Sequence, residues 1–252
     1  MAYRQSFAWW SFAGDSQDPA LLAAAAEIGY EGVDFLVPSL WAEARRLGLR
    51  LAVIDGHEPI EIGFNDPAQH AALGDQVRRA IEAAQCEGAA FVAVTSGDRR
   101  PNSGGDALTI CAHGLAPLAN EAAEAGVVLL IEPLNTKVDH PGHECDTTEW
   151  AAQLVRMVGS PALRINYDYY HAQIMEGNLM ATVDANRELI AHLHTAGVPG
   201  RHELDDSQEI NWRAIADHLR TTGYDGYVAH ELCPRGNPVA ALRQAFEIFD
   251  GT

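Results

Sequence analysis

The chain has 252 residues, of which 35 are acidic and 17 are Lys or Arg, so its formal net charge is −18. With 47% hydrophobic and 21% charged residues, the composition is that of a globular protein with a large core and unlike that of a disordered chain. The acidic excess argues against non-specific binding to nucleic acid and against docking on an anionic membrane, because both need a basic surface.

No targeting or membrane-spanning segment is expected. The N-terminal residues Met1–Ser6 lack the apolar stretch of a secretory signal, and the longest apolar run, Ala20–Ala26, is far below the roughly 20 residues that span a bilayer. The 4 cysteines are widely scattered and form no Cys-x-x-Cys pair. This spacing indicates reduced thiols and a cytoplasmic protein rather than a zinc knuckle.

Short runs with β-type patterning alternate along the chain with helix-type stretches. The predicted strands cover residues 6–9, 32–36, 49–54, 91–95, 127–134, 163–168, 190–195 and 227–232. The clearest predicted helices cover residues 19–28, 68–85, 107–125, 148–158, 179–189, 212–222 and 238–249. Pro19, Pro67 and Pro238 each follow Asp or Asn, as at a helix start, and a glycine follows several of these helices, as at a helix end.

The repeat length and the strand composition together predict the fold. Eight βα units in 252 residues give about 31 residues per unit, close to the ~30 of one βα repeat. The strands are nearly continuous Val, Leu and Ile runs, which is typical of strands buried on both faces. No Ser- or Pro-rich linker interrupts the chain, so we predict an α/β protein with one domain over residues 1–252, a (β/α)8 barrel. A doubly wound sheet is the alternative, but no Gly-x-Gly-x-x-Gly follows the first strand.

In a barrel the chemistry lies at the carboxyl ends of the strands, so polar residues that end apolar strands are candidates. Four of them end consecutive predicted strands: Glu132, Asp168, His194 and Glu231. Each has an ordinary alternative. A glutamate can leave a strand into solvent, an aspartate can cap the next helix, and a histidine can pack in the core. Their shared position at one end of the strands favours a common site.

The predicted strand 190–195 carries two histidines on one face. His192 and His194 alternate with apolar residues, so the period of two places them on the same side. We expect His194, which is nearer the carboxyl end, to be a ligand, and His192 to lie one layer deeper with a structural role. In the next strand, His230 points away from the face that Glu231 occupies.

Three carboxylates held close together repel one another, and a divalent cation removes that repulsion. Three oxygen donors and one imidazole suit Mn²⁺, Mg²⁺ or Co²⁺, and Zn²⁺ less well. The sequence therefore predicts one divalent cation held by Glu132, Asp168, His194 and Glu231.

Other residues near predicted strand ends are candidates for contact with a substrate. Trp10, next to Trp9, can wall the pocket against one face of a sugar, although ordinary packing is expected for at least one of the two tryptophans. His57 follows the third predicted strand and can reach a substrate. Weaker candidates are Arg99 and Arg100, for which a solvated corner is the ordinary reading. Three further residues in the loop after Glu132 could line the mouth of the barrel: Lys137, His140 and His143.

Several stretches of the chain resemble the xylose-isomerase-like superfamily of sugar isomerases and epimerases, and most closely its hydroxypyruvate isomerase branch. The most specific is Asp-Tyr-Tyr-His-Ala-Gln-Ile-Met-Glu-Gly at residues 168–177. The others are Ile131–Asn135, Val198–Glu203, Glu209–Trp212 and Gly223–Tyr227. The resemblance covers most of the chain.

This resemblance implies a barrel in which Glu132 and Glu231 are both metal ligands and acid/base groups, while His171 and Arg201 touch substrate oxygens. It also implies a homodimer or homotetramer. The sequence departs from the branch in two places. Typical hydroxypyruvate isomerases have Gln where His194 stands, a position at which the ketose 3-epimerases have His, and residues 55–59 are unlike the usual isomerase loop.

The predicted function is a divalent-metal-dependent isomerase or epimerase of a small sugar or hydroxy-keto acid, acting by proton transfer through a metal-stabilised enediolate. Three alternatives stay open. One is a metal-dependent lyase or dehydratase that acts on a keto-sugar or keto-acid. Another is metal-dependent phosphodiester cleavage of damaged DNA, which the charge of −18 disfavours. The last is a non-catalytic barrel subunit.

Overall fold

The computed structural model describes residues 3–100 and 106–251. Met1 and Ala2, part of the N-terminal run considered above, lie outside the described residues. The strands are β1 (Arg4–Phe7), β2 (Gly32–Val33), β3 (Arg50–Leu51), β4 (Val53–Asp55), β5 (Phe91–Val94), β6 (Val128–Ile131), β7 (Leu163–Asp168), β8 (Ile190–Thr195) and β9 (Tyr227–His230). The helices are α1 (Trp9–Ala13), α2 (Ala20–Ile28), the 3₁₀ helix η1 (Pro38–Leu40), α3 (Trp41–Arg46), α4 (His70–Glu87), α5 (Ala107–Ala125), α6 (Thr148–Val158), α7 (Tyr169–Met175), α8 (Leu179–Ala185), α9 (Trp212–Thr222) and α10 (Pro238–Asp250).

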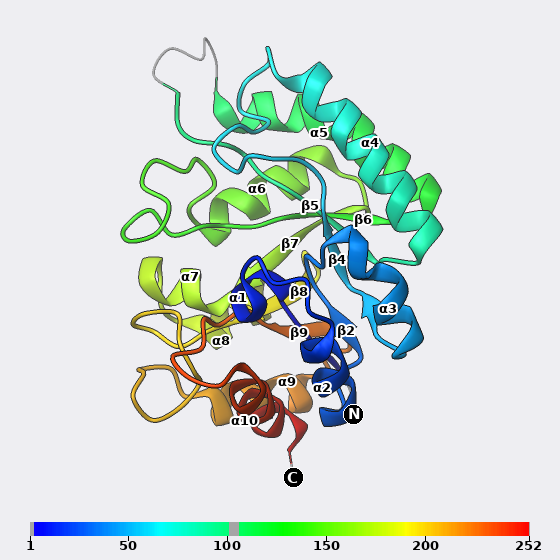
Figure 1. The fold of residues 1–252 in the computed structure, drawn as a ribbon. Helices are drawn as coiled ribbons and strands as arrows, with labels where there is room; N and C mark the ends of the chain where they lie inside the picture. Colours follow the sequence, from blue (N-terminus) through cyan, green and yellow to red (C-terminus); the bar gives the residue numbers. More distant parts are fainter. Residues whose placement is uncertain (1–2, 101–105, 252) are drawn as a thin grey trace. The chain divides into compact units, whose positions relative to one another are not determined.

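The chain forms two compact units, residues 1–52 with 192–252 and residues 53–191. In the unit formed by residues 53–191, strands β4, β5, β6 and β7 pair in chain order, and every pair is parallel. Helices α4, α5 and α6 pack one against the next beside these strands (Figure 1). This is the succession of strand, helix and parallel strand that βα units produce.

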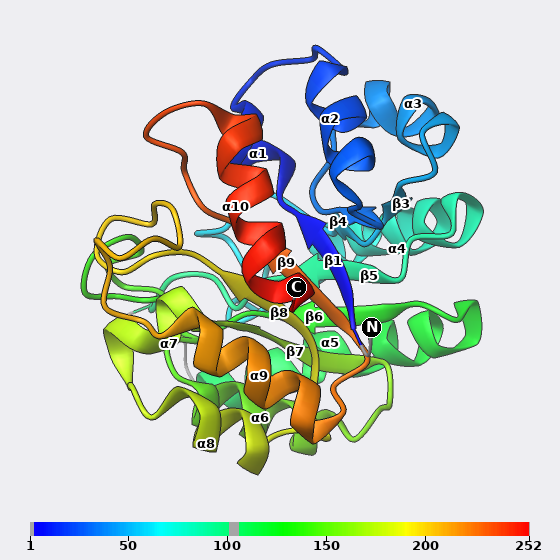
Figure 2. The ribbon, with the colours of Figure 1, turned by 90° about the horizontal axis from the view of Figure 1, so that it is seen from below.

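The unit formed by residues 1–52 and 192–252 joins the two ends of the chain. Strand β9 pairs in parallel with both β1 and β8, and β2 pairs in parallel with β3. The backbone N–H of Asp34 donates to the carbonyl of Phe7 at 2.8 Å, which sets the end of β2 beside β1. Helix α10 packs against β1 and α2 (Figure 2), and the Tyr3 hydroxyl donates to the Phe249 carbonyl at 2.8 Å.

The observed elements confirm the predicted (β/α)8 barrel. Strands β3 and β4 are separated by Ala52 alone and together fill the third strand position, where one strand over 49–54 was predicted. Parallel strands and helices then alternate through the chain as the barrel requires. The single domain over residues 1–252 stays a prediction.

Several predicted elements are confirmed at both ends: β7, β8, α5, α6 and α9. The first predicted strand is wrong at its end, because β1 stops at Phe7 and the aromatic run from Trp9, read as β-type, forms α1 instead. The predicted strand 127–134 ends at Ile131, since Pro133 has no N–H to donate to a ladder. The short helices α3 and α7 were not predicted.

Of the three predicted helix starts, the one at Pro238 is confirmed, whereas α2 begins at Ala20 and α4 at His70, after Pro19 and Pro67. The side chain of Asn237 accepts hydrogen bonds from the N–H groups of Val239 and Ala240, with Pro238 in the first turn of α10. No helix within residues 3–100 and 106–251 is long and apolar enough to cross a membrane. The cysteines are free thiols.

Candidate active site

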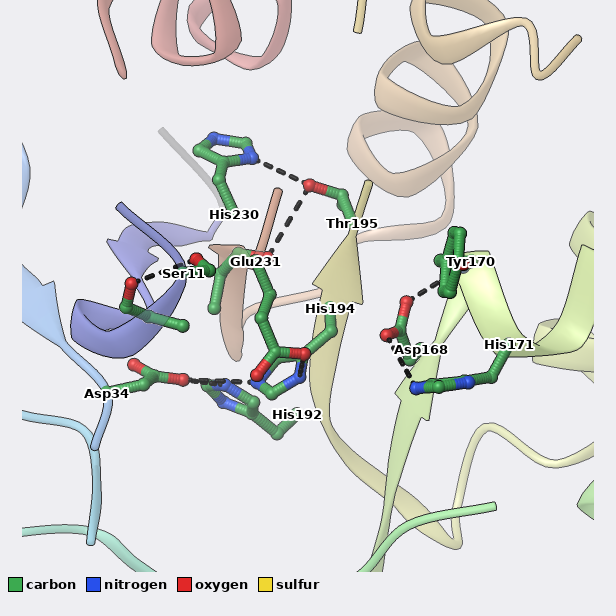
Figure 3. A network of polar contacts seen from close by, with 12 residues as sticks. Ser11, Asp34, Asp168, Tyr170, His171, His192, His194, Thr195, His230 and Glu231 are labelled. Atoms are coloured by element: carbon green, nitrogen blue, oxygen red, sulfur yellow. Dashed lines mark hydrogen bonds and ion pairs between the residues drawn. The ribbon is translucent and has the colours of Figure 1, made fainter. Parts of the chain in front are cut away.

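Glu231 lies one residue beyond β9, and its backbone N–H donates to the carbonyl of Thr195 at 2.9 Å. Both of its carboxylate oxygens are engaged. The Trp10 indole N–H donates to Oε1 at 2.8 Å, and Arg201 Nη2 donates to Oε2 at 2.5 Å. His194 Nδ1 lies 3.0 Å from the same Oε2 (Figure 3). The structure therefore brings together four predicted residues of the unit formed by residues 1–52 and 192–252.

The electrostatics of Glu231 keep it ionised. Burial by itself raises the pKa of a carboxyl, but the charges of His194 and Arg201 and the hydrogen bonds from His194 and Trp10 outweigh burial and hold the pKa of Glu231 below its usual range. Arg201 also stacks on Trp10, with its guanidinium carbon 5.3 Å from the ring centroid. Glu231 is thus a buried, ionised carboxylate in a fixed orientation.

A carboxylate that the sequence analysis did not select lies beside the two histidines of β8. Asp34, directly after β2, is fully buried, and its Oδ2 lies 2.6 Å from His192 Nε2 and 3.3 Å from His194 Nε2. Burial opposes ionisation, but the two imidazoles outweigh it and lower the pKa of Asp34. The predicted strand 32–36 placed Asp34 in its middle, and only the observed end of β2 at Val33 shows it as a carboxylate that follows a strand. His192 has the deeper, supporting position that its alternation predicted.

In the unit formed by residues 53–191, Glu132 follows β6 and Asp168 ends β7. The two strands pair in parallel, with Ile131 opposite Ile165, so both acids stand at the same edge. A carboxylate oxygen of Glu132 and one of Asp168 lie within 4.8 Å of each other. Asp168 also caps α7, because its Oδ1 accepts the N–H of Tyr170 at 2.7 Å (Figure 3). Asp168 is therefore a helix cap, as its ordinary alternative predicted. The cap uses Oδ1 alone, so Oδ2 can still belong to the site.

Two predicted substrate-contact histidines in this unit have defined tautomers. The N–H of Asn135 donates to His171 Nδ1 at 3.0 Å, and the N–H of Thr95 donates to His57 Nε2 at 3.1 Å. A nitrogen that accepts carries the lone pair, so the proton of a neutral ring is on the opposite nitrogen. Burial lowers the pKa of His57 to about 4, which keeps it neutral near pH 7. Both rings are therefore hydrogen-bond donors, His171 through Nε2 and His57 through Nδ1.

Some predicted placements are corrected. His171 lies in α7, directly after β7, and Trp9 and Trp10 begin α1 rather than end a strand. Trp9 is 1% exposed and packs in the core, whereas Trp10 is 43% exposed. Trp10 is therefore the tryptophan that can face a ligand.

The weaker loop candidates have structural partners. Arg99 and Arg100 pair with Asp146 and Asp66 on an exposed corner. The Lys137 ammonium donates to the Ile174 carbonyl at 2.8 Å, near the end of α7. The two ion pairs agree with the ordinary reading of the two arginines.

The donor atoms around Glu231 fit a divalent cation. His194 Nε2 faces Asp34 and its Nδ1 lies 3.0 Å from the ionised Glu231 Oε2, so without a cation a proton on Nδ1 makes the hydrogen bond that lowers the pKa of Glu231. Two facing acceptors repel unless a proton or a cation lies between them. A divalent cation in place of that proton would be held by His194 Nδ1 and Glu231 Oε2.

Comparison with known proteins identifies the family. The family described as "Xylose isomerase-like TIM barrel" matches residues 22–251. The chain is 32% identical over 251 residues to a human protein named putative hydroxypyruvate isomerase, covering 92% of this chain and 90% of that one. It is also 32% identical over 237 residues to a 2-oxo-tetronate isomerase of Cupriavidus necator, covering 87% of this chain and 88% of that one.

A solved structure agrees with the match. The crystal structure of a family 2 AP endonuclease from Brucella melitensis superposes with a TM-score of 0.84 at 26% identity, covering 95% of this chain and 96% of that one. The chain therefore belongs to the xylose isomerase-like TIM barrel family.

Proposed function

We propose that the protein is a divalent-metal-dependent isomerase or epimerase of a small hydroxy-keto acid or sugar. The observation that carries the proposal is the buried cluster at Glu231, with His194 Nδ1 at 3.0 Å and Arg201 at 2.5 Å. The names of the relatives, a putative hydroxypyruvate isomerase and a 2-oxo-tetronate isomerase, support the same reaction class. Both names describe isomerases of small hydroxy-keto acids.

The proposed cation site consists of Glu132, Asp168, His194 and Glu231. Barrel topology supports it, since the carboxyl ends of all barrel strands face the same mouth, and these residues stand at the ends of β6, β7, β8 and β9. The donor set favours Mn²⁺ or Mg²⁺ over Co²⁺ and Zn²⁺. A bound divalent cation supplies positive charge that stabilises the negative charge developing on neighbouring substrate oxygens.

In the proposed mechanism the two glutamates move the proton. One of Glu132 and Glu231 takes a proton from the substrate carbon next to the carbonyl, and the other returns a proton. Return to the adjacent carbon gives isomerisation, and return to the opposite face of the same carbon gives epimerisation. In the protein, Arg201 and Trp10 hold the Glu231 carboxylate in one orientation, so little reorganisation accompanies the transfer.

The substrate oxygens are proposed to bind to His171, His57 and Arg201. The two histidines are neutral donors with defined tautomers, so each offers one N–H to an oxygen without adding charge. Arg201 brings a positive charge suited to a carboxylate or an enediolate oxygen. Trp10, 43% exposed, offers a flat wall to a carbon skeleton.

The test is a screen of hydroxypyruvate, tartronate semialdehyde, ketotetronates and ketohexoses with Mn²⁺ in deuterium oxide. The expected result is manganese-dependent entry of solvent deuterium at a substrate carbon with an isomeric product. Glu132→Gln should lower the exchange about 10²–10⁴-fold, the range of acid/base catalysis. Glu82→Gln, a change of an exposed glutamate on α4, is the matched control and should exchange at the parental rate.

The same assay separates the alternatives. Loss of a β-substituent from the product identifies a lyase or dehydratase, and absence of exchange with every substrate contradicts the proposal in favour of a non-catalytic subunit. Cleavage of abasic duplex DNA would contradict it too, although the charge of −18 disfavours that substrate. We also propose that the enzyme works in the cytoplasm as a homodimer or homotetramer, with a small molecule and neither nucleic acid nor membrane as its partner. Gel filtration with light scattering tests the assembly.

A further inference from the structure

Asp34 is held by two kinds of contact. Its backbone is fixed beside β1, because its N–H donates to the Phe7 carbonyl at 2.8 Å and its carbonyl accepts the Trp9 N–H at 2.9 Å. Its carboxylate is fully buried and contacts His192 and His194 through one oxygen, Oδ2 (Figure 3). A carboxylate anchored in this way has one orientation.

These contacts determine which nitrogens of the two rings carry protons. An ionised carboxylate only accepts hydrogen bonds, so the Nε2 atoms of His192 and His194 are donors in both contacts, at 2.6 and 3.3 Å. His194 Nδ1 lies 3.0 Å from Glu231 Oε2 and is the nitrogen whose proton a cation would replace. The contact with Asp34 thus keeps the proton on Nε2 and leaves Nδ1 as the nitrogen that can bind a cation.

The same three residues have a competing interpretation. Asp34, His192 and His194 each offer a ligand atom within 4.8 Å of the others, so they satisfy the spacing of a metal site of their own. The 2.6 Å separation of Asp34 Oδ2 and His192 Nε2 is that of a charge-assisted hydrogen bond with a proton between the atoms. A cation bound through the same two atoms would displace that proton, so the geometry favours hydrogen bonding.

We propose that Asp34 is a positioning residue for His194. It holds the His194 ring in the Nε2–H tautomer and in one orientation, and His192 braces the Asp34 carboxylate from the other side. This inference rests on the proposed function in one respect, namely that His194 binds the cation. Carboxylate groups behind metal-binding histidines fix ring orientation and raise ligand basicity, and their loss typically weakens metal binding by about 10–100-fold.

The first experiment measures Mn²⁺ binding to the full chain without substrate, by the electron paramagnetic resonance signal of free Mn²⁺. Asp34→Asn removes the charge with little change of shape, and we expect its Mn²⁺ affinity to fall about 10–100-fold. Asp66→Asn is the matched control, because Asp66 is also a buried carboxylate but pairs with Arg100. It should bind Mn²⁺ within about threefold of the parent, far less than the effect of losing such a carboxylate.

The second experiment observes the tautomer directly. Long-range ¹H–¹⁵N correlation spectra of the metal-free protein should show His192 and His194 protonated at Nε2, and Asp34→Ala should deprotonate His194 Nε2 and leave the proton on Nδ1, where Glu231 accepts it. A residue that merely stabilises the fold would lower the thermal midpoint of the metal-free protein and leave the tautomer unchanged. The Nε2–H state in Asp34→Ala as in the parent would overturn the proposal.

The outcomes separate this inference from the proposed function. If the parent binds one Mn²⁺ per chain and Asp34→Asn binds it equally well, Asp34 does not position His194, and the proposed function stands. If the parent binds two ions and Asp34→Asn loses one, the three residues form a metal site and the inference is wrong. If the parent binds no Mn²⁺, both the inference and the metal dependence are overturned.

Discussion

Strands β8 and β9 bury histidines on both of their faces, and the two faces differ in what the rings contact. On one face His192 and His194 share the Asp34 carboxylate. On the other face His230 Nδ1 lies 2.7 Å from the Thr195 hydroxyl (Figure 3). Its Nε2 lies 3.0 Å from the Gln5 side-chain oxygen. All three histidines are 0% exposed, so burial does not distinguish them.

The difference is the charge of the partner. His230 has only neutral partners, and burial, opposed by the charge of Asp34, lowers its pKa to about 3, so it is a neutral ring in a satisfied polar network. Such a network stabilises a core and leaves no reactive group. His192 and His194 share a charged acceptor, and His194 has a second charged neighbour in Glu231. A buried histidine indicates chemistry when its partners are charged.

Loss of the charge on Glu231 should lower catalytic activity more than any other change, because it removes an acid/base group from the face that carries His192 and His194. Glu231→Gln is expected to lower deuterium exchange into the substrate about 10²–10⁴-fold, as loss of an acid/base group does. Glu203→Gln is the matched control, since Glu203 is also a glutamate paired with an arginine, Arg235, at 2.8 Å. Mass spectrometry of the product measures both. Exchange at the parental rate in Glu231→Gln would contradict the acid/base role.

A change on the neutral face should affect stability and leave the metal site intact. His230→Leu removes the partner of Thr195 and of Gln5, and each buried polar group left unsatisfied costs about 1–3 kcal/mol. Urea unfolding of the metal-free protein should show this loss. Mn²⁺ affinity should remain close to that of the parent. A tenfold loss of Mn²⁺ affinity would mean that the two faces are coupled and that the comparison between them fails.

The site residues that could be predicted from the sequence are those whose positions follow from strand periodicity. Asp168 and His194 belong to β7 and β8, whose ends were predicted correctly, and Glu132 and Glu231 directly follow apolar strands. Asp34 directly follows β2, which has only 2 residues, but the strand predicted there covered 32–36 and placed Asp34 in its middle rather than at its end. Trp10 was placed at the end of a strand because aromatic residues favour β structure, whereas tertiary contacts hold it in α1.

The contacts that give these residues their roles are distant in the chain. Asp34 and His192 are separated by 158 positions, and Trp10 and Glu231 by 221. Periodicity determines which face a side chain occupies but not which distant side chain meets it there. The pairing of Asp34 with both imidazoles, and of Trp10 with Glu231, therefore needed the structure.

The smallest predicted effect concerns a buried histidine in the unit formed by residues 53–191. His143 is 0% exposed, with Nε2 3.1 Å from the Ser96 hydroxyl and Nδ1 3.7 Å from Asp98 Oδ1. Burial, aided by the nearby charges of His140 and Arg99 and opposed by that of Asp146, lowers its pKa to about 4. Although Asp98 lies near, the ring is therefore neutral at pH 7.

The sign of the pH effect follows from this lowered pKa. An unfolded chain protonates histidine near pH 6.5, whereas folded His143 resists protonation until about pH 4. Between these values the unfolded state binds more protons, so His143 makes the protein less stable as the pH falls from 6.5 toward 4. His143 contributes at most about 1.4 kcal/mol per pH unit to the slope of the free energy of unfolding against pH.

His143→Gln should remove this part of the slope, because glutamine retains hydrogen-bonding groups and does not titrate. Urea unfolding at intervals between pH 4.5 and 7, the window set by the lowered pKa of about 4, measures the free energy of unfolding of both proteins. The stability of the parent should fall more steeply toward acid pH than that of the variant. Equal slopes would mean that His143 is protonated in the folded state, as a histidine whose interaction with Asp98 dominates would be. In that case a carboxylate 3.7 Å away would suffice to charge a buried ring, and neutrality could not be used to separate the structural histidines from those of the site.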